Sequence, residues 1–181
     1  AKSRRIVFQR DLQPKIDAVD AACRRELGLL ESPVQQNAFL NYAAAARVGI
    51  DSLALEESVR RALLRIDGIE DVYFRRDLTR RENVSFYLGR YQRSYYAPRG
   101  EDFYIRFCED CLVTTSLTGS THGSPYRYDT HVAMIFWGAG LPAKTVTREV
   151  HTVDIAPTIA EFLGITYPST VDGNPLPEVP N

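Results

Sequence analysis

The sequence predicts an α/β chain in which helices flank a mixed β-sheet. Short β-type runs and amphipathic helical segments alternate from residue 1 to residue 115, a pattern typical of helices packed on a sheet. The run VAMIFW, Val132 to Trp137, shows no apolar and polar alternation, and it therefore predicts a strand buried on both faces. With 44% hydrophobic and 25% charged residues, the 181-residue chain has the composition of an ordinary globular protein.

Two amphipathic helices are expected in the N-terminal part. After a short apolar start at Ile6 to Phe8, the segment Leu12 to Leu27 has apolar residues at helical spacing and stops before Gly28. An extended region, Pro33 to Tyr42, follows. Asp51 or Ser52 can then cap a second helix that runs as far as Gly68. The apolar face of this second helix consists of Leu55, Val59, Ala62, Leu63 and Ile66.

Strands are expected at Glu70 to Phe74 and at Phe103 to Thr115. The stretch between them, Thr79 to Asp102, is rich in arginine and tyrosine and is expected to form a loop. Arginine interleaved with tyrosine can contact the phosphates and bases of a nucleic acid. Because acidic residues are interspersed here and the net charge is −1, an ordinary surface is favoured and no nucleic-acid partner is expected.

The three cysteines do not form a recognisable framework. Cys108 and Cys111 form one C-x2-C pair inside the expected strand, and residues three apart on a strand point to opposite faces. Two ordinary thiols are therefore the favoured interpretation, with a strained disulfide and a metal site as the alternatives. Cys23 lies within the first expected helix and is interpreted as a packing residue.

The C-terminal part is expected to contain one helix and a turn-rich tail. Thr152 or Asp154 can cap a helix that starts at Ile155 and ends at Gly164, and His151 is most simply a neighbour of that cap. No apolar segment approaches the roughly 18 residues that a membrane-spanning helix needs, so no membrane partner is expected. The start of the chain also lacks the apolar core of a signal peptide.

Candidate metal-binding chemistry is concentrated at His122, Asp129 and His131. Imidazole and carboxylate groups suit Zn²⁺, but the spacing is not that of a helical H-E-x-x-H site. From the residues alone, a hydrogen-bonded or exposed histidine is favoured at position 122, with metal ligation as the alternative. His131 stands at the entrance of the expected buried strand, where a packed side chain is favoured.

Three motifs carry a resemblance to a known family. The runs STHGSPYRYDTHVAMIFWGAGL, VHTVDIAPTIAEFLGI and VDGNPL resemble the C-terminal part of zinc alkaline phosphatases of the PafA type, in the alkaline phosphatase superfamily. Upstream segments such as QQNAFLNY and RSYYAPRGEDFYI are similar to the middle region of those enzymes. The resemblance implies that residues 1–113 form an inserted or cap-like α+β region and that residues 114–181 form the C-terminal part of the alkaline-phosphatase-like core.

The resemblance also implies roles for individual residues. His122 matches the histidine of the family's THGSPY motif, which binds zinc, while Asp129 and His131 match positions expected to orient the loop through hydrogen bonds. The implied parent enzyme contains two zinc ions and a threonine or serine nucleophile, and it hydrolyses phosphate monoesters. Ala133 replaces a proline that is common after the HV pair, which affects only local strand geometry.

The nucleophile motif and the other zinc ligands of the family precede the matched region, and the sequence contains no Asp-His pair. The chain is therefore expected to be part of a longer enzyme and, by itself, to bind no zinc and to be inactive. A phosphodiesterase or nucleotide pyrophosphatase of the same superfamily remains an alternative, as does a non-catalytic domain that contacts a partner through Arg75 to Arg99. Members of the family are usually periplasmic or secreted, and that location is expected here.

Overall fold

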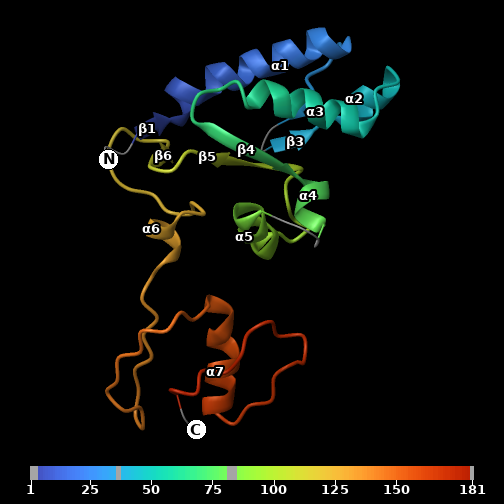
Figure 1. Ribbon diagram of the computed structural model, residues 1–181. Coiled ribbons are helices and arrows are strands. Elements are labelled where there is room, and N and C mark those ends of the chain that lie inside the picture. Colours follow the sequence, from blue (N-terminus) through green and yellow to red (C-terminus); the bar gives the residue numbers. More distant parts are fainter. Residues whose placement is uncertain (1–3, 36–37, 81–84, 180–181) are drawn as a thin grey trace. The chain divides into compact units, whose positions relative to one another are not determined.

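The computed structural model describes residues 4–35, 38–80 and 85–179 (Figure 1). They form two compact units, Ala1–His131 and Val132–Asn181. The predicted class, mixed α/β with small sheets and flanking helices, is confirmed. The boundary expected between residues 113 and 114 stays a prediction about the domains of a parent enzyme.

The first strand and the first helix begin the N-terminal unit. Strand β1 (Arg4–Val7) pairs in parallel with β6 (Cys111–Thr114), so that the start of the unit lies beside a segment more than a hundred residues later. A short π-helix, Phe8–Leu12, leads into α1 (Gln13–Leu27). Gly28 ends α1 in the left-handed conformation with φ of 67°, as its position predicts. The helix expected from residue 12 to residue 27 is thereby confirmed.

The expected extended region is also confirmed where it is described. Strands β2 (Val34–Gln35) and β3 (Phe39–Leu40) form a short antiparallel pair, and residues 36–37 lie outside the described part. The helix α2 (Tyr42–Arg47) then follows, although the sequence did not predict it. Its N-terminus is capped by the side chain of Asn41, which accepts a hydrogen bond from the Ala44 N–H at 3.0 Å.

The second expected helix is confirmed but is shorter than predicted. Helix α3 (Ser52–Leu63) is capped by Asp51, whose carboxylate accepts a hydrogen bond from the Ala54 N–H at 2.8 Å. The helix ends five residues before Gly68 because the chain must turn there to enter the next strand. Ile66 is buried within that turn, so the apolar periodicity extends beyond the helix itself.

The strand expected at Phe103 to Thr115 is two strands. Strand β5 (Phe103–Phe107) pairs antiparallel with β4 (Ile69–Phe74), whereas β6 pairs with β1. Between β5 and β6 the chain turns at Asp110, which adopts φ of 64°, a conformation that aspartate tolerates better than most residues. This turn brings Cys108 and Cys111 together in a disulfide with a Cα–Cα distance of 5.2 Å. The two ordinary thiols expected from a continuous strand are therefore a wrong prediction.

The arginine- and tyrosine-rich stretch is partly helical, which corrects the prediction of a loop. Helix α5 (Phe86–Ser94) forms in it, after helix α4 (Arg75–Thr79), which ends where the stretch begins, and residues 81–84 lie outside the described part. Ser85 caps α5, its hydroxyl accepting a hydrogen bond from the Leu88 N–H at 3.3 Å. Aromatic residues and a glycine have low helix propensity, so packing against the β4–β5 pair must stabilise α5.

The core of the N-terminal unit lies between α1, α3 and the β4–β5 pair, and Figure 1 shows the two helices side by side over the strands. The apolar face predicted for α3 is confirmed, since all five of its members are buried. Helix α5 lies at the opposite side of β4 and β5, and α4 follows directly on the end of β4 (Figure 1). None of the helices in the described ranges has the length and apolar character of a bilayer-spanning helix.

The C-terminal unit is built around helix α7 (Ile155–Phe162), which confirms the helix expected there. A 3₁₀ turn, Thr152–Asp154, precedes it, and His151 stands at the N-cap of this turn as expected. The tail is tied to the start of α7, because the Leu176 N–H donates to the Thr158 hydroxyl at 2.9 Å. The tail is turn-rich, as expected, and it buries Leu176 against its own unit.

The strand expected at Val132 to Trp137 does not form, which is the largest error of the sequence interpretation. The segment has no regular secondary structure and pairs with no strand of the described residues, and Ile135 and Trp137 are 83% and 96% exposed. A strand buried on both faces needs neighbouring strands, and the described part of the chain offers none to this segment. The sequence pattern therefore indicates a buried segment, but in the described residues the Ile135 and Trp137 side chains are exposed.

Asp154 gives a testable prediction for the C-terminal unit. Its buried carboxylate accepts hydrogen bonds from the backbone N–H groups of His151 and Asn174, both at 2.9 Å. The Asn174 bond, followed by that of His151, lowers the pKa of Asp154. Because the folded-state pKa is depressed, the stabilisation is present at neutral pH and is lost as the pH falls below about 4 and through the folded-state value.

Asp154→Asn is expected to destabilise this unit by about 1–3 kcal/mol, since the amide nitrogen that replaces one carboxylate oxygen cannot accept a hydrogen bond and one of the two backbone N–H groups loses its partner. Hydrogen exchange of the α7 amides and of the Leu176 amide, measured at about pH 7 and about pH 3, checks this. The wild type should lose protection in acid, and the variant should be less protected at neutral pH and less sensitive to acid. Equal protection in both proteins at neutral pH would contradict the assignment.

Candidate metal-ligand loop

The loop between β6 and the short helix α6 (Arg127–Thr130) carries the candidate site residues. From Thr115 to Gly123 this loop is exposed and has no regular secondary structure. The imidazole of His122 lies on it, exposed to solvent, and Gly123 follows with φ of 102°, a conformation that favours glycine. His122 is therefore accessible to a ligand rather than packed in the core.

Asp129 is bonded to the loop that contains His122. Its carboxylate accepts a hydrogen bond from the Ser124 N–H at 2.8 Å, two residues after His122. Ser124, through its hydroxyl and then its backbone N–H, lowers the pKa of Asp129, and the nearby imidazole of His122 adds to this lowering. Asp129 is thus ionised at neutral pH and closes the loop around Ser124, which is the type of contact expected of an orienting residue.

His131 does not stand at the entrance of a buried strand, because that strand is absent from the described residues. Its side chain is exposed, and its backbone N–H donates to the Arg127 carbonyl at 2.8 Å, which ends α6. The packed side chain favoured from the sequence is therefore a wrong prediction. Its expected orienting role stays a prediction, since the contact found for it is made by the backbone.

Tyr126 connects this loop to the β4–β5 pair, a function that the sequence interpretation missed. The side chain is only 3% exposed, and its hydroxyl donates a hydrogen bond to the Phe107 carbonyl at 2.6 Å. Arg106 donates to the same hydroxyl at 3.0 Å. The signal available in the sequence was the tyrosine itself, which stands between a proline and an arginine in a polar loop. An aromatic side chain at such a place can bury a large area by packing against the fold.

Two arginines of the arginine-rich segment considered for phosphate contacts, Arg75 and Arg90, are engaged within the protein. Arg75 donates to the carbonyls of Ala97 and Gly100 at 2.8 and 3.0 Å and pairs with Asp102 at 3.2 Å. Arg90 donates to the Pro125 carbonyl at 3.1 Å and lies over the Phe86 ring at 4.5 Å from its centre. These side chains brace the fold, with Arg90 bound directly to the loop that carries His122.

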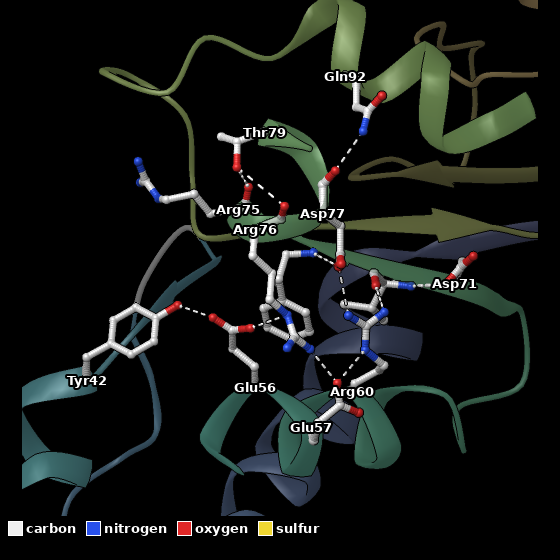
Figure 2. A network of polar contacts seen from close by, with 12 residues as sticks. Tyr42, Glu56, Glu57, Arg60, Asp71, Arg75, Arg76, Asp77, Thr79 and Gln92 are labelled. Atoms are coloured by element: carbon white, nitrogen blue, oxygen red, sulfur yellow. Dashed lines mark hydrogen bonds and ion pairs between the residues drawn. The ribbon is translucent and has the colours of Figure 1, made fainter. Parts of the chain in front are cut away.

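A network of polar contacts joins helix α3 to α4 (Figure 2). Arg76 pairs with Glu56 at 2.8 Å and with Glu57 at 2.5 Å, while Arg60 pairs with Asp77 at 2.8 Å. In Figure 2 the two arginines and the carboxylates of α3 face one another between the two helices. Each charged group has an oppositely charged partner, so this network is best explained as structural.

The carboxyl group of Glu56 is the most deeply buried member of this network. It accepts a hydrogen bond from the Tyr42 hydroxyl at 3.1 Å, and its residue is 7% exposed. Burial raises the pKa of Glu56, whereas the Tyr42 hydrogen bond and the charge of Arg76 act in the opposite direction. Because its oxygens face Tyr42 and Arg76, Glu56 is a poor candidate for binding a ligand.

The described residues can supply a metal ion with only one of the several ligands that it needs. No group of three or more histidine, cysteine, aspartate or glutamate side chains in the described ranges is arranged to hold a metal. Zinc affinity comes from three or four converging ligands, so His122 alone binds zinc weakly. Its exposed imidazole on a braced loop is a suitable single ligand for a site completed by other residues.

No family model matches the chain. Three curated proteins align with parts of it. Alkaline phosphatase PafA of Elizabethkingia meningoseptica is 34% identical over 85 residues, 47% of this chain and 16% of the relative. Alkaline phosphatase PhoV of Synechococcus elongatus is 33% identical over 75 residues, 41% of this chain and 14% of the relative. A protein named calcium-transporting ATPase, of Myroides odoratus, is 45% identical over 60 residues, 33% of this chain and 11% of the relative.

Solved structures show the same relationship at the level of the fold. The crystal structure of wild-type alkaline phosphatase PafA matches 91% of this chain with a TM-score of 0.78 and 22% identity, and a mutant form matches with 0.77 and 21%. This chain corresponds to 32% of the PafA chain in those structures and to less than a fifth of each curated relative. In sequence and in fold, the chain is related to the PafA-type alkaline phosphatases of the alkaline phosphatase superfamily.

Proposed function

We propose that this chain is part of a zinc-dependent phosphatase that hydrolyses small phosphate monoesters. His122 supplies one zinc ligand, and Asp129 and His131 orient the loop that carries it. The remaining zinc ligands and a threonine or serine nucleophile come from parts of the parent enzyme outside these residues. When bound, two zinc ions would stabilise the charge of the attacking and leaving oxygens of the phosphate ester.

One observation carries this proposal. The loop around His122 presents an exposed imidazole, and the fold that contains this loop is similar to that of alkaline phosphatase PafA. The carboxylate of Asp129 holds the Ser124 N–H, two residues after His122, and so restrains the backbone that follows the imidazole. An exposed histidine on an unbraced loop would not support a metal-ligand role to the same extent.

The exposed apolar segment agrees with a chain that is completed by other parts of a parent enzyme. Ile135 and Trp137 expose nearly their whole side chains, in a run whose pattern is that of a buried strand. Burial of each such side chain contributes about 1.5–3 kcal/mol, so covering this segment with other parts of the enzyme would stabilise the folded enzyme. The neighbouring strands of the alkaline-phosphatase-like core are the proposed cover.

The proposal predicts a division of activity between the parent enzyme and this chain. The intact parent is expected to hydrolyse p-nitrophenyl phosphate and to lose that activity when a chelator removes its zinc. The purified 181-residue chain is expected to show no turnover with or without added zinc, because one imidazole cannot hold the ion. Turnover by the isolated chain that a chelator abolishes would contradict this division.

The same assay separates the alternative substrates. Bis-p-nitrophenyl phosphate tests the phosphodiesterase alternative, and ATP tests whether the activity named for the Myroides odoratus relative extends to this protein. We expect kcat/KM of the intact parent to be higher for the monoester than for either. A higher value for the diester would assign the protein to the phosphodiesterase branch, and no hydrolysis of any of the three would support a non-catalytic domain.

A periplasmic or secreted location is part of the proposal. The disulfide between Cys108 and Cys111 is compatible with it, because disulfides persist mainly in oxidising compartments. Fractionation of cells that produce the intact parent, with phosphatase activity measured in each fraction, tests the location directly.

A further inference from the structure

The loop that carries His122 has few contacts with the rest of its unit. Arg5 donates to the carbonyls of Ser116 and Gly119 before His122, and Arg90 donates to the Pro125 carbonyl after it. Between these points the residues from Thr115 to Gly123 are exposed. The position of the imidazole therefore depends on how firmly the following residues, 124–130, are held.

Tyr126 is the anchor of these following residues. It is the one residue of 115–131 whose side chain is buried, and the Asp129 and Thr130 N–H groups both donate to its carbonyl at 3.0 Å. Its ring makes an edge contact with Tyr87 of α5 at 5.3 Å and stacks with Tyr128 at 5.9 Å. The backbone bonds connect Tyr126 to Asp129, and Asp129 is bonded to the backbone beside His122.

Arg106 binds this anchor to the strands. Its guanidinium donates to the Tyr126 hydroxyl at 3.0 Å and to the Tyr73 hydroxyl of β4 at 3.2 Å. The same group lies over the Tyr87 ring, 4.8 Å from its centre. The planar guanidinium of Arg106 thus joins a residue of β4, a residue of α5 and the loop. The flexible side chain of a lysine could make only some of these contacts.

We propose that Arg106 and Tyr126 are positioning residues that hold the loop of His122 on the β4–β5 pair, so that the imidazole is placed to bind zinc. This inference rests on the proposed function, because it assigns Arg106 and Tyr126 to the same metal site. The route runs from the Arg106 guanidinium to the Tyr126 hydroxyl, then through the Tyr126 carbonyl to Asp129 and the Ser124 N–H. Residues that orient metal ligands typically affect metal affinity or activity about 10–100-fold.

The experiment uses the intact parent enzyme and four substitutions. Tyr126→Phe removes the hydroxyl and keeps the ring, and Arg106→Met removes the donors and keeps the length of the side chain. Arg106→Lys restores one donor, and Tyr128→Phe is the matched control, because Tyr128 is an exposed tyrosine of the same loop. The measurements are the rate of zinc loss to a chelator, hydrogen exchange of residues 115–125 in the metal-free protein, and kcat/KM.

Tyr126→Phe and Arg106→Met are expected to accelerate zinc loss about 10-fold and to lower kcat/KM by a similar factor. Both should also increase the rate of hydrogen exchange in residues 115–125 of the metal-free protein. A substitution that affected only the catalytic step would leave this rate unchanged. Arg106→Lys should recover part of each effect, and Tyr128→Phe should behave as the wild type. The double variant should lose less than the sum of the two single losses, since both substitutions remove the contact between Arg106 and Tyr126.

His122→Ala separates the two ways in which this inference can fail. If His122→Ala loses zinc and activity while Tyr126→Phe and Arg106→Met match the wild type in all three measurements, the positioning role is wrong and the proposed function stands. If His122→Ala keeps its zinc and its activity, the proposed function fails and the positioning role fails with it. Unchanged exchange in residues 115–125 in both anchor variants would by itself overturn the route through Tyr126.

Discussion

Replacing His122 with alanine in the intact parent enzyme is expected to lower kcat/KM for a phosphate monoester by about a thousand-fold or more. A metal ion that stabilises the charge of a phosphoryl-transfer transition state contributes several kcal/mol, and each 1.36 kcal/mol corresponds to about a factor of ten. The variant should also bind less zinc after dialysis, as measured by elemental analysis. Stability should change little, because the His122 side chain is exposed.

The matched control for this substitution is His151→Asn. His151 is an exposed histidine at an N-cap, where asparagine is equally suitable, so activity and zinc content should both remain at the wild-type level. If the His122→Ala variant binds zinc and hydrolyses the phosphate monoester as the wild type does, the interpretation of this chain as a non-catalytic domain becomes the better one. A loss of activity with full zinc content would instead assign His122 to substrate binding.

Phe74→Ala is expected to give the largest loss of stability among core substitutions, about 3–5 kcal/mol. Phe74 lies at the end of β4 with no exposed surface. Its ring packs against Phe103 with centroids 5.6 Å apart, and the Arg60 guanidinium lies 4.9 Å from its centre. Alanine would remove the ring between strands and helix, leaving a cavity that the surrounding residues can fill only in part. Urea unfolding of the 181-residue chain, followed by circular dichroism, measures the loss.

Phe74→Leu and Leu30→Ala serve as controls for this measurement. Leucine keeps most of the buried volume at position 74 and should cost less than about 1.5 kcal/mol. Leu30 is exposed, so its truncation should change stability by no more than about 0.5 kcal/mol. A loss for Phe74→Ala as small as that of Leu30→Ala would mean that the β4–α3 packing described above does not form in solution.

Local signals in the sequence were sufficient for the class of the fold and for the main helices. The spacing of apolar residues in α1 and α3, the Asp51 cap and the glycine after α1 each depend on neighbours a few residues away, and each was confirmed. The relationship to PafA-type alkaline phosphatases was likewise visible in continuous motifs around His122 and Asp154. The roles of His122, Asp129 and His131 in metal binding stay predictions.

The errors occurred where distant contacts decide the structure. Helix α5 has poor intrinsic propensity and forms against the β4–β5 pair. The turn at Asp110 splits one apparent strand between two partners, β1 and β4, that are more than sixty residues apart in the sequence. The segment from Val132 to Trp137 carries the pattern of a buried strand, yet a pattern cannot supply the neighbours that pair with it.

The sequence by itself determined the helices of the core, the class of the fold and the family motif that singles out His122, because periodicity, caps and motifs are local properties of the chain. Only the tertiary structure decided which side chains hold that motif in place. Arg106 lies twenty residues before Tyr126, and nothing in either neighbourhood indicates that the two meet. Contacts of the loop with β5 and α5 bring them within hydrogen-bonding distance, since the Tyr126 hydroxyl bonds to Phe107 and the Tyr126 ring packs against Tyr87. These contacts join residues far apart in the sequence and form only when the whole unit packs, so no local pattern predicts them.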